Sequence, residues 1–222
     1  MKLLYIPAPA ILQKGYGGIF NWYVTQDSRG ICPAGWHVPT ISEIKTMLDD
    51  VGASGNYDYN TIAYKLREAG IEHWEYLNES TTNESGFTAI GSGVRDSDGE
   101  FGEQKQYFYI WTTSGRNIYK YDLMIPCYDN STSIGEGSPK YGFSLRFFKN
   151  DSIWNPGDTV TDIDGNIYHT VKIGNQVIMA ENYKGKHYNN GDAIPLVTDN
   201  TAWANPGGVG MRCYYDNDPT NE

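Results

Sequence analysis

Two short acidic segments carry the residues best suited to binding a metal ion. Asp162, Asp164 and Asn166 place side-chain oxygens at alternating positions, and the stretch from Asp96 to Glu100 repeats this pattern. Oxygen ligands are what Ca²⁺ prefers, but neither segment continues with the glutamate and the spacing of a full calcium loop. Each segment contains a glycine, which suits a tight turn. We therefore interpret both as turns and predict no metal site and no cofactor.

His37 lies close to Cys32 in the sequence and could act as a base toward a thiol nucleophile. Such a pair needs a third group to orient the base, and none is near in the sequence, so we expect a packed, hydrogen-bonded histidine. His73, His169 and His187 are scattered singly. The chain has no GxSxG, HExxH, P-loop or dinucleotide-binding motif. These observations favour a non-catalytic protein.

The three cysteines do not form a recognisable site. Cys32, Cys127 and Cys213 make no CxxC pair and have no histidine at zinc spacing. An odd count allows either one disulfide with one free thiol or three buried thiols. The cysteines are therefore compatible with both an oxidising and a reducing compartment.

Aromatic side chains are the best candidates for contact with a ligand. The chain has 18 Tyr, 6 Trp and 7 Phe, and many of them gather in one stretch of the sequence. Aromatic rings stack on sugar faces and anchor protein interfaces, while alternating strand positions send about half of them into the core. The candidate ligand-binding residues are Tyr107, Tyr109, Trp111, Tyr119, Tyr121 and Tyr128.

Two helices are predicted to position these segments. The clearer one starts after Thr40, because Thr40 and Glu43 have the spacing of a capping box, and it ends at Gly52. Apolar residues recur on one face between those limits. A second helix is predicted over residues 60–69, where apolar side chains share one stripe before Gly70.

The later parts of the chain have the two-residue period of β-strands. The clearest prediction is a hairpin with strands at residues 159–163 and 167–173, joined by an Asp-Gly-Asn turn. Residues 151–158 have the composition of a connector. From residue 183 onward the chain is polar and predicts long ordered loops.

Six segments of the sequence match one known family. They are residues 31–40 (ICPAGWHVPT), 83–89 (NESGFTA), 95–99 (RDSDG), 141–146 (YGFSLR), 164–176 (DGNIYHTVKIGNQ) and 179–182 (MAEN). Together they resemble the Fibrobacter succinogenes major paralogous domain, from about residue 16 onward. This resemblance implies an α+β, C-type-lectin-like fold: a loop-rich mixed sheet with two helices, whose first and last strands lie close together. The lectin-type Glu-Pro-Asn and Trp-Asn-Asp motifs are absent, so calcium-dependent sugar binding is not implied.

The order of these segments differs from the family's order. Residues 16–150 resemble the carboxyl-terminal part of the family domain, and residues 159–222 resemble its amino-terminal part. Residues 151–158 would connect them, and residues 1–15 would form an amino-terminal arm. We therefore predict one circularly permuted domain closed within the chain, since a local connection costs little loop entropy. The alternative is exchange between chains, which would build a ring or filament.

The closed arrangement makes two specific predictions about packing. Val171 and Ile173 should share a core with Leu145 and Phe147. The strand around Leu145 and Phe147 should also lie beside the first strand of the hairpin, at residues 159–163. A half-sheet left without its partner strands would expose unpaired edge groups.

Charge and hydropathy exclude some functions. The chain has 17 Lys plus Arg against 27 Asp plus Glu, a net charge of −10, and no basic run, so nucleic acid is not an expected partner. No apolar run approaches the ~20 residues of a membrane span, so no membrane insertion is expected. The first 12 residues resemble a signal peptide, but two prolines interrupt them, and we predict an ordered arm.

These observations favour a non-catalytic binding and assembly module on a virion surface or outside the cell. We expect a phage fibre, decoration or receptor-binding component that forms homo-oligomers or assembles with other virion or surface proteins and contacts a surface glycan. A secreted bacterial carbohydrate-binding or adhesion module is the first alternative. A purely architectural virion protein is the second.

Overall fold

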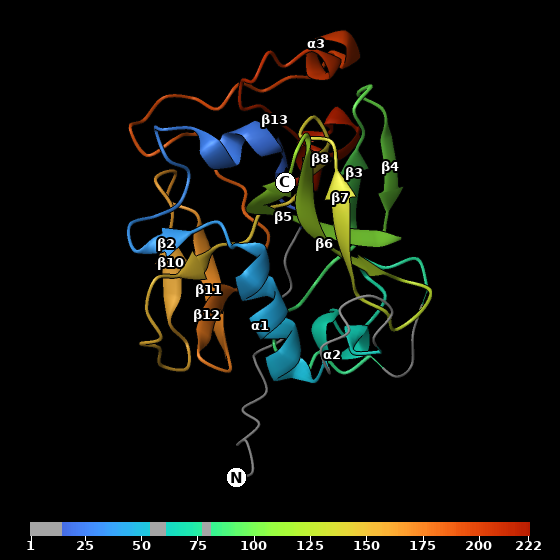
Figure 1. Cartoon of the computed structure of the whole chain (residues 1–222), viewed down its shortest axis with the longest axis vertical. Coiled ribbons are helices and arrows are strands. Elements are labelled where there is room, and N and C mark those ends of the chain that lie inside the picture. The colour runs from blue at the N-terminus through green and yellow to red at the C-terminus, as the bar shows by residue number, and fades with distance from the viewer. Residues whose placement is uncertain (1–14, 54–60, 77–80) are drawn as a thin grey trace.

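A computed structural model describes residues 15–53, 61–76 and 81–222. Antiparallel sheets and a few helices make up this part of the chain (Figure 1). The structure is α+β and rich in sheet, which confirms the sequence prediction at this level. The predicted arm falls, except for its last residue, outside the described residues.

Helix α1 (Ile41–Val51) has the start and the end that the sequence predicts. Thr40 Oγ1 accepts a hydrogen bond from Glu43 N, and the Glu43 carboxylate accepts one from Thr40 N. Gly52 ends the helix with a left-handed φ of 118°, which favours glycine. The apolar face of the helix packs into a buried cluster with the sheets.

The second predicted helix is wrong in length. Only Ala63–Leu66 is helical (α2), and the predicted start near residue 60 lies outside the described residues. Arg67 is already extended, with φ −69° and ψ 148°. Its buried guanidinium donates hydrogen bonds to the carbonyl oxygens of Pro126 and Cys127. This tertiary contact draws the chain out of helical geometry, although the local apolar pattern is helical.

One five-stranded sheet combines strands from distant parts of the sequence, in the order β10-β11-β12-β9-β2. Its β10–β11 hairpin confirms the predicted one. Asp162 Oδ1 accepts hydrogen bonds from the backbone N–H groups of Asp164 and Asn166, both at 2.9 Å, so this acidic segment is a turn. The strands are β10 (Thr159–Thr161), β11 (Ile167–Ile173), β12 (Gln176–Met179), β9 (Phe148–Lys149) and β2 (Trp36–His37).

The two predicted packing contacts are wrong in detail. Strand β9 lies between β12 and β2, whereas β10 pairs with β11 at the edge of the sheet. Val171 and Ile173 pack in one cluster with Phe148, but Leu145 and Phe147 belong to a second cluster. Successive strand residues point to opposite faces, so the neighbours Phe147 and Phe148 enter different cores.

A second five-stranded sheet has the order β13-β1-β8-β3-β4, and a three-stranded sheet has the order β5-β6-β7. The second sheet contains β13 (Arg212–Cys213), β1 (Ile19–Asn21), β8 (Gly142–Phe143), β3 (Ser92–Arg95) and β4 (Phe101–Gln104). The third contains β5 (Tyr107–Arg116), β6 (Tyr119–Pro126) and β7 (Ser133–Gly137). The remaining helical turns are η1 (Trp22–Gln26), α3 (Asn200–Ala204), η2 (Tyr215–Asn217) and η3 (Pro219–Asn221).

The last residues of the sequence lie against the first described ones. Strand β1 pairs with β13, and Tyr16 N donates a hydrogen bond of 2.8 Å to Asn221 O. Gly15 has no room for a side chain, because a Cβ atom there would collide with the carbonyl of Glu222. The two segments therefore run side by side.

Two buried arginines link the late part of the chain to the early part. Arg146 Nε donates to Asn182 Oδ1 at 2.8 Å, and its Nη2 donates to Thr88 O at 2.8 Å. Arg95 Nη1 donates to Val197 O at 2.6 Å. Burial lowers the pKa of Arg146 to about 9, so the guanidinium is still charged at neutral pH. Carbonyl and amide oxygens, rather than carboxylates, satisfy both side chains.

We predict that Arg146→Met lowers the free energy of unfolding by about 3 kcal/mol, because buried oxygens of Thr88 and Asn182 lose their donor. Urea unfolding followed by circular dichroism measures this difference. Arg116→Met is the matched control, since Arg116 is exposed, and it should change stability by less than ~0.5 kcal/mol. Equal effects of the two variants would contradict the prediction.

Candidate functional site

The three-stranded sheet separates a buried core from a more open face. On β5, Phe108 and Ile110 are fully buried in the core, whereas Tyr109 lies on the opposite face. On β6, Asp122 and Met124 share that face, and Met124 lies directly opposite Tyr109. The period of two thus gathers aromatic, acidic and thioether side chains on one surface.

The structure brings three of the six predicted aromatic residues together. The Tyr107 and Tyr109 rings stack with centroids 5.6 Å apart, and the Tyr107 and Tyr128 hydroxyls are 2.5 Å apart. Trp111 is fully buried, and its Nε1 donates a hydrogen bond to Phe20 O, so this ring packs in the core.

The other two predicted residues lie nearer the β5–β6 turn. Tyr119 is exposed, and Tyr121 is half-buried. Tyr121 precedes Asp122 on β6 and therefore points to the opposite face of the strand. These two side chains do not join the group around Tyr109.

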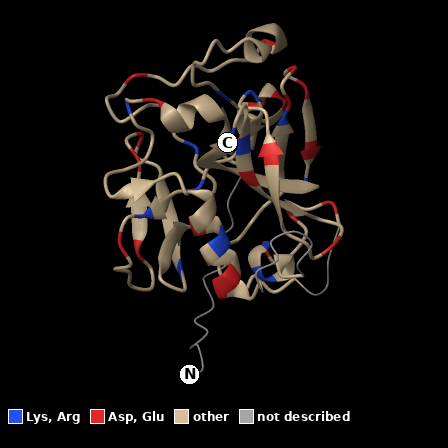
Figure 2. Ribbon diagram, in the orientation of Figure 1, with Lys and Arg blue, Asp and Glu red and all other residues tan. Residues whose placement is uncertain are grey.

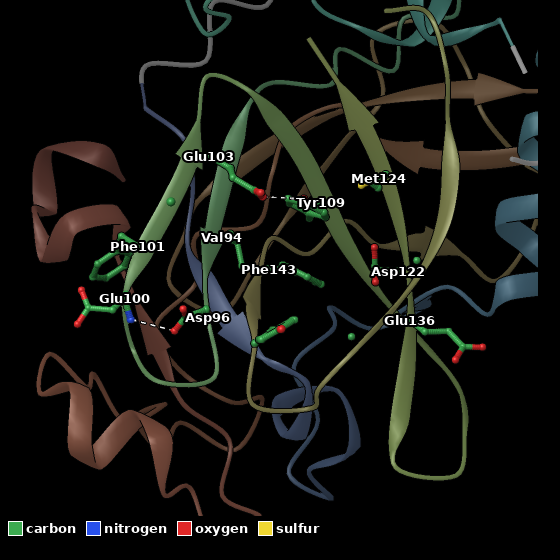
Figure 3. Close-up of a pocket in the computed structure, with 14 residues that line it drawn as sticks. Val94, Asp96, Glu100, Phe101, Glu103, Tyr109, Asp122, Met124, Glu136 and Phe143 are labelled. Carbon is green, nitrogen blue, oxygen red and sulfur yellow. Dashed lines mark hydrogen bonds between the residues drawn. The ribbon is translucent and has the colours of Figure 1, made fainter. Parts of the chain in front are cut away.

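A pocket of about 430 Å³ lies between the β3–β4 hairpin and the open face of the three-stranded sheet (Figure 3). Residues of β8 and of the segment that precedes it complete its wall. The volume falls within the range of small-molecule sites. Of the six aromatic residues predicted from the sequence, Tyr109 lines this pocket and the other five do not.

An aromatic wall forms one side of the pocket. The rings of Tyr109 and Phe143 stack with centroids 4.6 Å apart and planes 10° apart. Tyr141 packs beside Phe143 at a centroid distance of 5.9 Å. The Tyr109 hydroxyl donates a hydrogen bond of 2.7 Å to Glu103 Oε2. Burial and this bond raise the pKa of Tyr109, so the hydroxyl keeps its proton at physiological pH.

Asp122 is the most unusual group in the pocket. It is 3% exposed, and no group in the described part of the chain donates a hydrogen bond to its carboxylate. Asp122, on β6, lies opposite Gly135 of β7. A Cβ atom at Gly135 would come within 2.5 Å of Asp122 Oδ1. Burial raises the pKa of Asp122 to about 7. A carboxylate therefore occupies space that a side chain on the neighbouring strand would fill.

The walls of the pocket carry acidic side chains and no basic ones. Five of the lining residues are Asp or Glu, and none is Lys, Arg or His. Figure 2 shows acidic residues on β4 and β7, and Glu103 and Glu136 of these two strands line the pocket. Glu100 Oε1 accepts a hydrogen bond from Asn200 Nδ2, and the Glu136 side chain points away from the others (Figure 3). Of the remaining carboxylates, Glu103 accepts a hydrogen bond from Tyr109, and Asp122 lies on the same face of the sheet as Tyr109.

A family model described as the Fibrobacter succinogenes major domain matches residues 4–149, which is more than half of the chain. The chain belongs to this family. The matched stretch of the Fibrobacter domain contains every residue that lines the pocket. No curated protein and no solved structure gives a significant match.

The limits of the Fibrobacter match differ from those of the resemblance found in the sequence. The match begins at residue 4, ahead of residue 16, and ends at residue 149. It does not include the β10–β11 hairpin or anything that follows. The reversed order of the two parts therefore stays a proposal.

The second acidic segment of the Fibrobacter domain is also a turn. Asp96 Oδ1 accepts hydrogen bonds from the backbone N–H groups of Asp98 and Glu100, at 2.8 and 3.0 Å. The interpretation of both acidic segments as turns is confirmed. Within residues 15–53, 61–76 and 81–222, no three His, Cys, Asp or Glu side chains gather closely enough to hold a metal ion.

His37 makes two hydrogen bonds, as the sequence predicts. Its Nδ1 lies 2.7 Å from Asn150 Oδ1, and its Nε2 lies 2.8 Å from Glu43 Oε1. The three cysteines are free thiols. Burial raises the pKa of Cys32 to about 12, so this thiol is protonated and a weak nucleophile at neutral pH.

Sequence reasoning missed most of the pocket. Asp122 is the one acidic residue of the strand Tyr119–Pro126 and directly precedes its apolar half, and this position was the one available signal. Phe143 and Tyr141 belong to a segment that the resemblance identified, but nothing in the sequence placed them against β5. Gly135 became informative only when the pairing of β6 with β7 was known.

Proposed function

We propose that this member of the Fibrobacter family is a binding module that holds a glycan in its pocket. The observation that carries the proposal is an aromatic wall beside a buried carboxylate that has no partner in the protein. Aromatic rings pack on the apolar faces of sugars, and carboxylates accept hydrogen bonds from their hydroxyl groups. Tyr141 supplies the accessible ring, Phe143 packs behind it, and Asp122 supplies the acceptor.

We further propose that the module binds without turnover. A buried carboxyl with a raised pKa is also what a general acid needs, so Asp122 alone does not exclude hydrolysis. Glycoside hydrolysis uses a second carboxylate as base or nucleophile. One candidate, Glu103, already accepts a hydrogen bond from the Tyr109 hydroxyl, and the Glu136 side chain points away from the pocket residues (Figure 3).

We propose that the fold is C-type-lectin-like and circularly permuted. Strand β12, which is early in the family order, pairs with β9, which is at its end. The contact between Tyr16 and Asn221 supports a native connection at this point in the unpermuted order. Residues 151–158 would then form the new connection, and a swap of the same segments between chains is the alternative.

We propose an outer-surface location, on a phage particle as a fibre, decoration or receptor-binding protein. The partners would be copies of the same chain or other virion or surface proteins. A secreted bacterial carbohydrate-binding or adhesion module is the alternative, and a purely architectural virion protein would bind no glycan. No helix among the described residues is long and apolar enough to cross a membrane.

Immobilised oligosaccharides from bacterial surfaces and plant cell walls test the proposed function. The labelled protein should bind at least one group of them, and Tyr141→Ala should weaken binding about tenfold by removing part of the aromatic wall. Tyr76→Ala is the matched control, because Tyr76 is exposed and outside the pocket. Both variants are first compared by thermal melting.

Three outcomes of this experiment would count against the proposal. Absence of binding to every oligosaccharide would favour the architectural alternative. Equal loss of binding in the Tyr76 and Tyr141 variants would place the site elsewhere. Recovery of cleaved oligosaccharide from the wild-type protein would show that the module is catalytic.

A further inference from the structure

The pocket holds negative charge that its own walls do not balance. Five acidic residues line it, and no lysine, arginine or histidine does. Low-dielectric walls with one sign of charge focus the electric field and raise the local concentration of ions of the opposite sign. The chain as a whole is also acidic, with a net charge of −10. The pocket therefore favours a positively charged ligand.

Asp122 identifies the point where that positive charge would lie. Buried carboxylates in folded proteins are normally paired, because an unpaired one lacks the hydrogen bonds that water would supply. Asp122 has no such partner although it is 3% exposed. Gly135 leaves the space in which the carboxylate lies. The carboxylate thus lies at the pocket wall without a donor from the described part of the protein, so a ligand in the pocket can supply one.

A metal ion is a poor candidate for this donor. No group of three metal-binding side chains occurs in the part of the chain that the structure describes. Glu100 and Glu136 are directed away from Asp122 (Figure 3). An organic ammonium ion needs a single carboxylate and also gains from nearby aromatic faces through cation–π attraction. Tyr141 and Tyr109, which line the pocket and are partly exposed, provide aromatic rings for this contact.

We propose that the pocket binds an amino sugar whose protonated amine pairs with Asp122. The inference rests on the proposed glycan-binding function and adds the charge of the ligand to it. The ammonium group donates hydrogen bonds to the Asp122 carboxylate, while the sugar ring packs on Tyr141, the half-buried ring of the aromatic wall. A rigid sugar ring beside an ammonium group fits an aromatic wall better than a flexible lysine side chain does, because less conformational freedom is lost.

Two oligosaccharides with the same rings and linkages test this inference on the full chain. The tetramer of β-1,4-linked glucosamine carries free amines, and its fully N-acetylated counterpart carries none. Calorimetric titration at neutral pH and low salt should show that the glucosamine tetramer binds at least about tenfold more tightly, as expected for a charge-assisted contact. Asp122→Asn should abolish this preference.

The matched control is Glu72→Gln, which removes one exposed negative charge outside the pocket. Its affinity for the glucosamine tetramer should stay within about twofold of wild type, since a distant exposed charge is screened. Thermal melting of both variants checks that the fold is kept. An equal loss of affinity in the two variants would show a general charge effect and overturn the role of Asp122.

The remaining outcomes separate the inference from the function on which it rests. Equal or tighter binding of the N-acetylated tetramer would overturn the inference and leave glycan binding intact. If neither tetramer binds but Nα-acetyl-lysine amide does, and Asp122→Asn removes that binding, the amino sugar is wrong and the ligand is another organic ammonium ion. Binding of none of the three compounds would overturn the inference, whereas the oligosaccharide screen decides the function by itself.

Discussion

A chain that ends at Asn150 is expected not to fold cooperatively. Without residues 151–222, β9 would lack its partner β12 and β1 would lack its partner β13. Two strand edges would then lose their hydrogen-bond partners. Arg146 would lose Asn182, and Arg95 would lose Val197 and Thr198 as acceptors. These buried guanidinium groups would then lack part of their hydrogen bonding.

The loss of apolar contacts is larger still. The cluster that contains Phe147 also contains Tyr168, Met179, Tyr183 and Ile194, all of which come after residue 150 and are almost fully buried. Burial of one such side chain contributes roughly 1.5–3 kcal/mol. Several of them together are comparable with the whole net stability of a domain, about 5–15 kcal/mol. The fragment has no other source of stability to replace them.

Thermal melting followed by circular dichroism distinguishes the outcomes. Residues 1–150 should show no cooperative transition, and addition of residues 151–222 as a separate chain should restore one. A reordered chain is the matched control: it runs from residue 159 to 222, through a short glycine linker, and on from residue 15 to 150. It keeps every pairing described above and should melt cooperatively as a monomer. A soluble 1–150 fragment with a sharp melting transition would mean two independent domains.

Local features of the fold could be predicted from the sequence because local residues determine them. The capping box at Thr40 and the left-handed Gly52 fix both ends of α1 without help from the rest of the chain. The hairpin closed by Asp162 is similar, since one carboxylate satisfies the backbone of its own turn. The family resemblance drew on several such segments at once.

Features that depend on distant pairing could not be predicted in this way. Helix α2 ends early because Arg67 reaches carbonyl groups of residues 126 and 127, far along the chain. The partners of β9 depend on where β12 lies in space. The pocket needs the β3–β4 hairpin to lie across the β5–β7 sheet, and the sequence pattern of neither element encodes that contact. Asp122 was visible in the sequence only as an acidic residue beside the apolar half of its strand.

Asp122→Asn is expected to make the protein more stable at pH 8, by an amount on the order of 4 kcal/mol at most. Burial raises the pKa of Asp122 to about 7 from its ordinary value of 3.8. At pH 8 the wild-type protein must therefore hold a buried, unpaired negative charge, whereas asparagine is neutral. A residue that serves a ligand would thus lower the stability of the free protein.

The sign of the pH dependence follows from proton binding. Between pH 4 and pH 7 the folded protein keeps the proton on Asp122, while the unfolded chain has lost it. The contribution of this group to the free energy of unfolding is therefore complete below pH 4. It falls by about 1.4 kcal/mol per pH unit as the pH rises toward 7. Asparagine does not titrate, so the stability of the variant relative to wild type should rise between pH 4 and pH 7 and stay constant above pH 7.

Urea unfolding of both proteins at pH 4, 6 and 8 measures the difference directly, with Glu72→Gln as the control. The control should differ from wild type by less than ~0.5 kcal/mol at every pH, because the side chain is exposed. A stability difference for Asp122→Asn that does not change with pH would mean that burial does not perturb the carboxyl group. The unpaired charge from which the amino-sugar inference begins would then not exist. A pH-dependent gain in stability together with lost affinity for the glucosamine tetramer would instead locate both effects at the same carboxylate.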